Sequence, residues 1–80
     1  MEKQDLIAKI NSALATEFEV DESVITPEAN IKETLSLDSL SLVDLVALIE
    51  SEFGIKIQGA EMVKIQTFAA LYDFVYDKVR

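Results

Sequence analysis

Apolar side chains recur every three or four positions in three stretches of this 80-residue chain. That spacing places them along one face of an α-helix, so each stretch predicts a helix with one buried side. The predicted helices cover residues 3–18, residues 39–53 and a last segment that begins after Thr67. The apolar positions are Leu6, Ile7, Ile10, Leu14 and Phe18 in the first, Leu42, Val43, Val46, Ile49 and Phe53 in the second, and Phe68, Leu71, Tyr72, Val75 and Val79 in the third.

The connection between the first two predicted helices, residues 19–38, is long for so small a chain. It keeps apolar residues among its polar ones, and because a loop with nothing to bury is usually more polar, we expect it to be ordered and pinned across the core. Thr26 and Pro27 predict the start of a short helical turn, with Thr26 as its cap and Pro27 in the first position. The apolar residues of the connection are Val20, Val24, Ile25, Ile31, Leu35 and Leu37.

Shorter signals complete the predicted fold. Gly54 suits the left-handed conformation that ends a helix, residues 60–64 predict one short helical turn, and Thr67 is placed to cap the last helix. Eighty residues are enough for one small core, so we expect a single domain over residues 1–80. Together these signals predict an all-α fold, a small four-helix bundle of three long helices and one short one, with a long ordered loop between the first two.

The charge balance excludes several kinds of partner. Seven Lys and Arg against 15 Asp and Glu leave a net charge of −8, which a nucleic acid or an anionic membrane surface would repel. The longest apolar run, residues 45–49, is too short to insert across a bilayer. The chain starts without the apolar stretch of a secretion signal, so we expect a cytoplasmic protein.

The chain contains neither Cys nor His. This composition leaves out thiolate nucleophiles, imidazole acid–base catalysis and the usual zinc ligands, so we expect a non-catalytic protein without a metal site. Glu17, Glu19, Asp21 and Glu28 have the spacing of a calcium loop, but Glu22 stands where that loop needs a glycine. Weak binding of divalent ions by clustered carboxylates stays open.

The segment Asp38-Ser39-Leu40 lies where the long connection meets the second predicted helix. Either Asp38 or Ser39 is placed to cap that helix by accepting a hydrogen bond from an unpaired backbone N–H. A hydroxyl in the first helical turn also lies near the positive end of the helix dipole, which would stabilise a phosphate attached there. Nothing nearby activates Ser39 as a nucleophile, so another protein would have to attach the group. The sequence is compatible with both the capping and the phosphate-acceptor interpretations.

The order of these features resembles that of the acyl carrier proteins. The resemblance covers nearly the whole chain and includes the amphipathic first helix, the long loop, a short third helix and a closing helix. Its motifs are Ile25-Thr26-Pro27-Glu28-Ala29 in the loop, Asp38-Ser39-Leu40 and Val43-Asp44-Leu45-Val46 in the second helix, and Ile49-Glu50-Ser51-Glu52-Phe53-Gly54-Ile55 at its end.

The resemblance implies that Ser39 receives 4′-phosphopantetheine from a dedicated phosphopantetheinyl transferase, with Asp38 beside it helping that transferase to dock. The thiol of the cofactor would then carry acyl groups as thioesters between synthase enzymes that have basic docking patches. The family also implies a docking surface on the second helix and an acyl pocket between the helices. The implied docking residues are Leu40, Val43, Asp44, Glu50 and Glu52, and the implied pocket residues are Leu45, Val46 and Ile57.

Three positions depart from the family's usual pattern. Ser36 stands where glycine is common, Ser41 where an acidic residue is frequent, and Gln58 where proline is often found. These departures put in doubt which synthase the chain serves. Type II fatty acid biosynthesis is the commonest role of a free-standing carrier, and a specialised polyketide, aryl-polyene or peptide-synthetase carrier is the alternative. A cofactor-free helical adaptor that binds partners through its acidic helix is an alternative of a different class. We expect a monomer.

Overall fold

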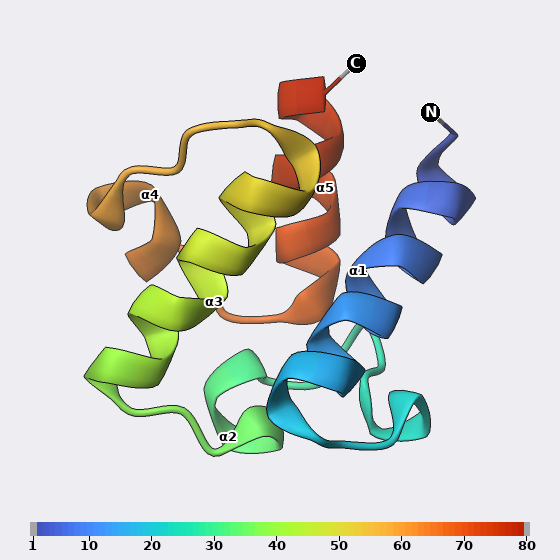
Figure 1. The fold of residues 1–80 in the computed structure, drawn as a ribbon, viewed down its shortest axis with the longest axis vertical. Helices are drawn as coiled ribbons and strands as arrows, with labels where there is room; N and C mark the ends of the chain where they lie inside the picture. Colours follow the sequence, from blue (N-terminus) through green and yellow to red (C-terminus); the bar gives the residue numbers. More distant parts are fainter. Residues whose placement is uncertain (1, 80) are drawn as a thin grey trace.

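The computed structural model describes residues 2–79, and the side chain of Ser39 lies outside the described part. Within that range the chain is helical, and β structure is limited to one isolated bridge between Asn30 and Thr67. The elements in chain order are α1 (Lys3–Phe18), a 3₁₀ turn η1 (Glu22–Val24), α2 (Ile31–Leu35), α3 (Ser39–Phe53), α4 (Gly59–Val63) and α5 (Phe68–Val79) (Figure 1).

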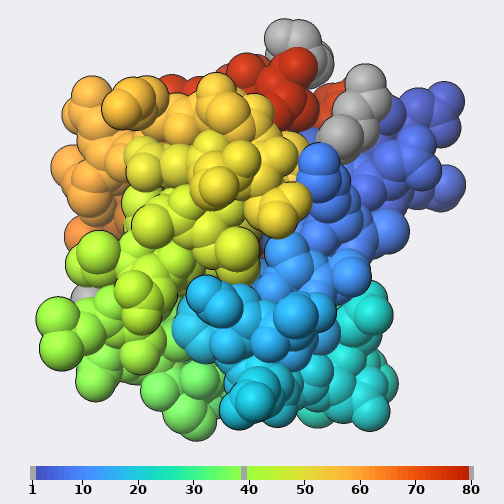
Figure 2. Space-filling view, viewed as in Figure 1, coloured from blue at the N-terminus to red at the C-terminus, as the bar shows by residue number. Residues whose placement is uncertain are grey.

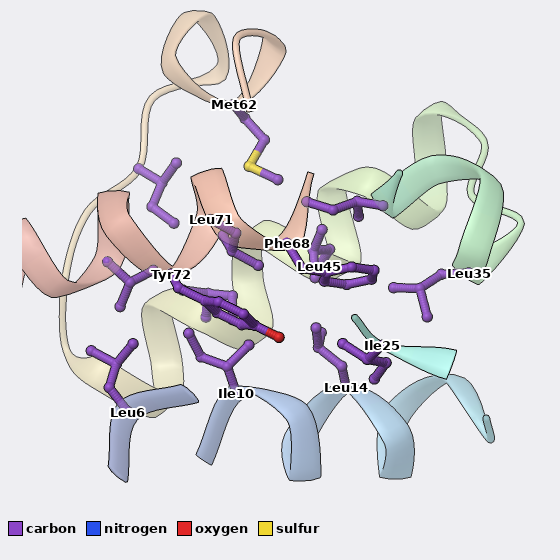
Figure 3. Close-up of a cluster of buried hydrophobic side chains, with 14 residues drawn as sticks. Leu6, Ile10, Leu14, Ile25, Leu35, Leu45, Met62, Phe68, Leu71 and Tyr72 are labelled. Atoms are coloured by element: carbon purple, nitrogen blue, oxygen red, sulfur yellow. The ribbon is translucent and has the colours of Figure 1, made fainter. Parts of the chain in front are cut away.

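The three long predicted helices and the short one before the last are confirmed, and together they enclose one apolar core. In Figure 1, α1 and α5 run alongside each other, α3 crosses beside them, and α4 flanks α3 at the edge of the bundle. Figure 3 shows side chains from α1, α3, α4 and α5 converging on a common centre. The fully buried members are Leu6, Ile10 and Leu14 of α1, Leu45 and Ile49 of α3, and Phe68, Leu71 and Val75 of α5.

Tyr72 is the one polar-tipped side chain that the described part of α5 contributes to this core. Its hydroxyl donates a hydrogen bond to Oδ1 of Asn11 on α1, which satisfies the buried oxygen. Burial raises the pKa of Tyr72 because it disfavours the charged phenolate. The hydrogen bond therefore ties α1 to α5, and the ion pair between Lys3 and Asp73 joins the same two helices.

The long connection between α1 and α3 is ordered and pinned across the core, as its composition predicts. Ile25, Ile31 and Leu35 are buried, with 7% or less of their surface exposed. Backbone hydrogen bonds also join the connection to the start of α5: Ile31 N donates to Gln66 O over 2.9 Å, and Ala69 N donates to the carbonyl of Pro27 over 3.0 Å. The connection is thus held both against the core and to the start of α5.

The helical turn predicted to start at Thr26 and Pro27 is wrong in position. Those residues form a non-helical turn, closed by a bond from Ala29 N to Thr26 O over 3.1 Å. The short helix, α2, begins four residues beyond Pro27 at Ile31, where Asn30 acts as the N-cap and its Oδ1 accepts from Glu33 N. Since the carbonyl of Pro27 accepts a hydrogen bond from α5, tertiary pairing decides where this helix starts.

Three helix ends adopt the left-handed conformation: Glu19 after α1, Ser36 after α2 and Gly54 after α3. Gly54 ends α3 with φ 64°, which confirms the prediction made from its lack of a side chain. Ser36 ends α2 with φ 53°, a conformation that strains a residue with a Cβ atom. The structure therefore explains why a glycine suits this position, two residues before Asp38.

Ser36→Gly is expected to raise the free energy of unfolding by about 0.5–1 kcal/mol, because relief of the left-handed strain exceeds the added flexibility of the unfolded chain. Chemical denaturation with an unchanged slope is the measurement. Ser12→Gly, at an exposed position inside α1, is the matched control and should lower stability instead. A loss of stability in both variants would contradict the strain assigned to Ser36.

Candidate functional site

Asp38 caps α3. Its backbone is extended, its Oδ1 accepts a hydrogen bond from Ser41 N over 2.8 Å, and its carbonyl accepts from Leu42 N over 2.9 Å. This settles the capping alternative in favour of Asp38 over Ser39. The hydrogen bond from the Ser41 N–H, followed by that from its side chain, holds the pKa of Asp38 below its ordinary value of 3.8, so the carboxylate is charged at neutral pH.

Ser39 is the first residue of α3, directly after this cap. Its backbone position is described, whereas the placement of its hydroxyl lies outside the described part of the chain. The neighbours on both sides are exposed, and Leu40 in particular keeps 78% of its surface accessible. The space-filling view places the first turns of α3 at an edge of the molecule (Figure 2). A residue at this point lies at the positive end of a 15-residue helix dipole.

A groove of about 360 Å³ runs beside the start of α3. It is lined by Lys32 of α2, Leu37 and Asp38 before α3, and Leu42 of α3. The lining combines one cation, the Asp38 carboxylate and two apolar side chains. The cation and the apolar side chains suit a ligand that has an anionic group at one end, placed toward Lys32 and away from Asp38, and an uncharged, partly apolar body.

The implied docking residues do not all share one face of α3. Leu40, Val43 and Asp44 lie three and four residues apart and are all exposed, so they form one continuous stripe, which we call the exposed stripe. Glu52 is exposed too, but it borders a separate groove against α1, together with Lys9. Glu50 is only partly exposed, and its carboxylate is engaged in a backbone contact near α4. The structure thus brings three of the five together.

An apolar pocket of about 160 Å³ lies between α3 and α4. Of the three implied pocket residues, only Val46 lines it; Leu45 is fully buried in the core and Ile57 is buried before α4. The reason is helix geometry, since Leu45 and Val46 are neighbours in sequence and point about 100° apart around α3. The residues lining the pocket are Leu42, Val43, Val46, Gly59 and Met62.

Sequence reasoning missed the α4 side of this site. Gly59 and Met62 of α4 line the pocket, and Met62 is also buried against the core. The available signal was the breadth of the apolar stripe on α3, which is too wide for one buried face and indicates a second apolar neighbour. The breadth of this apolar stripe does not, however, indicate which short element of the chain supplies the second neighbour.

Asp38→Ala is expected to lower the melting temperature by a few degrees at neutral pH, because it removes the cap of α3. The pKa of Asp38 is lowered in the folded state, so its contribution to stability is complete above pH 3.8 and is lost as the pH falls through the lower, folded-state value. The difference in melting temperature between the wild type and Asp38→Ala should therefore become smaller as the pH falls through that acid range. Thermal melts across a pH series measure it.

Asp38→Asn is the matched variant for this experiment, because asparagine caps helices about as well as aspartate and carries no charge. We expect it to melt near the wild type at neutral pH, without the acid-dependent change. If the difference in melting temperature between the wild type and Asp38→Ala stayed constant as the pH fell below 3.8, that result would contradict a charged cap.

Two properties of the described residues bear on other functions. None of the helices within residues 2–79 combines the length and apolarity that crossing a membrane requires. In the same range, no group of three or more Asp or Glu side chains is arranged to hold a metal ion.

Comparisons with known proteins define the class to which the fold and this site belong. The family described as "Phosphopantetheine attachment site" matches residues 8–75, so the chain is a carrier domain for a covalently attached 4′-phosphopantetheine. It is 38% identical over 77 residues to the acyl carrier protein of Thermotoga maritima, covering 96% of this chain and 95% of that one. It is 39% identical, with the same coverage, to the acyl carrier protein of Rubrobacter xylanophilus.

A solved structure supports the same assignment. The fold is similar to that of the acyl carrier protein from Enterococcus faecalis, with a TM-score of 0.80 and 28% sequence identity over 98% of this chain and 99% of the other. The chain belongs to the acyl carrier protein family, and its function is that of an acyl carrier.

Proposed function

We propose that Ser39 is the residue that carries 4′-phosphopantetheine and that acyl groups travel on it as thioesters. The observation that supports the proposal most is the place of Asp38-Ser39-Leu40 at the exposed, capped start of α3, inside the segment that matches the attachment-site family. The test is incubation of the purified chain with a phosphopantetheinyl transferase and coenzyme A, followed by mass spectrometry, in parallel with a known carrier. Addition of one phosphopantetheine group is the expected result.

The groove beside the start of α3 fits this group. Lys32, which lines this groove, would neutralise the phosphodiester on Ser39, and the positive end of the α3 dipole favours the same negative charge. Leu37 and Leu42 offer apolar surface to the uncharged arm. When attached, the cofactor supplies the thiol that a chain without Cys cannot provide.

The apolar pocket between α3 and α4 is the proposed shelter for the acyl chain. Its lining is almost entirely apolar, and it opens next to the exposed stripe, on the same helix as Ser39. Val46 is the implied pocket residue that fits this role directly. Leu45 and Ile57 support the pocket from the core side, where both are buried.

Partner enzymes are proposed to dock on the exposed stripe. Leu40 and Val43 provide an apolar centre, with 78% and 64% of their surfaces accessible, and Asp44, one turn beyond Leu40, adds a charged contact beside them. Asp38 flanks the attachment residue and is available to the transferase. Glu52 lies outside the exposed stripe, at the groove against α1, and would act there only as a peripheral charge. Rim charges of this kind raise association rates more than affinity, which suits a carrier that must be released.

The wider role follows from the family. The chain is proposed to act as a monomeric, non-catalytic carrier in the cytoplasm and to serve the transferase and acyl-transferring synthase enzymes, with type II fatty acid biosynthesis as its pathway. A specialised polyketide, aryl-polyene or peptide-synthetase pathway is the alternative, and the acyl group found on the native protein would distinguish them. A mass that stays unchanged while the known carrier is modified would instead support a cofactor-free adaptor.

A further inference from the structure

Two carboxylates hold the backbone immediately before α4. Oε2 of Glu50, on α3, accepts a hydrogen bond from Ile57 N over 2.8 Å in a partly buried setting. Oε1 of Glu61, on α4, accepts from Gln58 N over 3.3 Å. Its other oxygen, Oε2, lies 3.6 Å from Nζ of Lys78 near the end of α5. Consecutive amides are thus fixed to α3 on one side and, through Glu61, to α5 on the other.

The position of α4 sets the width of the apolar pocket. Gly59 and Met62 of α4 form one wall, and Leu42, Val43 and Val46 of α3 form the opposite wall. Since α4 has only five residues, it has little helical stability of its own, and its place depends on tertiary contacts. The bond from Ile57 N to Oε2 of Glu50 is a side-chain hydrogen bond that links the segment before α4 directly to α3.

The size of the pocket indicates the class of acyl group that it takes without rearrangement. Its volume of about 160 Å³ is close to the ~150 Å³ of an engineered protein cavity that binds benzene. Benzene has six carbon atoms, so an acyl chain of about that length fits. A longer chain extends beyond this volume, out of the shelter of the pocket, unless α4 moves away from α3.

We propose that Glu50 is a positioning residue whose carboxylate, by holding the amide of Ile57, keeps α4 against α3 and limits the acyl pocket to short chains. The inference rests on the proposed function, because it assumes that the acyl group on Ser39 enters this pocket. It changes the role of Glu50 from the docking contact implied by the family to a determinant of chain length. Glu61, within α4, also helps to hold α4 in place through its contacts with Gln58 N and Lys78.

The test uses the full chain loaded by the transferase from hexanoyl-coenzyme A or decanoyl-coenzyme A. The rate at which hydroxylamine cleaves each thioester reports how well the chain is sheltered. In the wild type, the hexanoyl thioester should be cleaved more slowly than the decanoyl thioester. In Glu50→Ala the difference should disappear, and the amide of Ile57 should exchange its hydrogen about fivefold faster, the size expected from loss of one hydrogen bond.

Two variants separate positioning from charge. Glu50→Gln loses the charge and keeps an oxygen that accepts from Ile57 N, so it should restore the wild-type chain-length difference. Glu22→Ala removes an exposed carboxylate from η1, at the far side of the bundle in Figure 1, and should leave both readouts unchanged. If Glu50→Ala does not fold, Glu61→Ala provides the same comparison from the α4 side.

The outcomes distinguish the two proposals. A wild-type chain that accepts no acyl-phosphopantetheine would overturn the proposed function itself. A loaded wild type that shelters hexanoyl and decanoyl groups equally, or a chain-length difference that survives in Glu50→Ala, would overturn only the role of Glu50. An equal change in Glu50→Gln and Glu50→Ala would also overturn it, because charge and not the hydrogen bond would then be responsible.

Discussion

Ser39→Ala should abolish uptake of phosphopantetheine while leaving the fold intact. The variant removes the only atom on this residue that can form a phosphodiester, so the modified species should fall to the detection limit. The helix should still form, because Asp38 supplies the cap and alanine is the most favourable residue for a helix. The measurement is the mass of the intact protein after incubation with the transferase and coenzyme A, together with a thermal melt.

Ser51→Ala is the matched control for this experiment. Ser51 is an exposed serine on the same helix, three turns further along, and its replacement should leave the modification complete. Modification that persists in Ser39→Ala would move the attachment site to another hydroxyl. Absence of modification in both the wild type and Ser51→Ala, with a known carrier modified alongside, would favour the cofactor-free adaptor.

Leu45→Ala should destabilise the protein by about 2–5 kcal/mol, because it removes a side chain with no exposed surface from the centre of the core. Small domains have a free energy of unfolding of roughly 5–15 kcal/mol, so this single change should bring the chain close to unfolding. Denaturant titration at constant slope is the measurement. Protection of the acyl thioester from hydroxylamine should decrease only in proportion to the loss of folded protein.

Val46→Ala, at the next position, should behave differently. Val46 is partly exposed and lines the pocket between α3 and α4, so its truncation should lower stability by ~1 kcal/mol or less. It should instead speed hydroxylamine cleavage of a bound hexanoyl thioester, because it removes two methyl groups from the pocket wall. Equal losses of stability in the two variants would contradict the division of α3 into a core face and a pocket face.

Much of the fold could be read from local patterns. The helices over residues 3–18 and 39–53, the cap at Thr67 and the left-handed end at Gly54 follow from side-chain spacing and backbone preference, and the structure agrees with each. The start of α2 could not be read in the same way. Its place depends on hydrogen bonds between the long connection and α5, whose partners lie about 40 residues away in the chain.

The features of the candidate site likewise divide into those that the sequence determines and those that only the tertiary structure decides. The sequence by itself determined that the chain has no thiol, so that the one an acyl carrier needs must be supplied by its cofactor, that Asp38-Ser39-Leu40 opens a helix, and that the chain is strongly acidic. Only the tertiary structure decided that Val46 faces the pocket while Leu45 faces the core, and that Glu50 turns to the backbone before α4. The physical reason is that periodicity records how residues are distributed around one helix, whereas the neighbours of each face are set by distant segments packed against it.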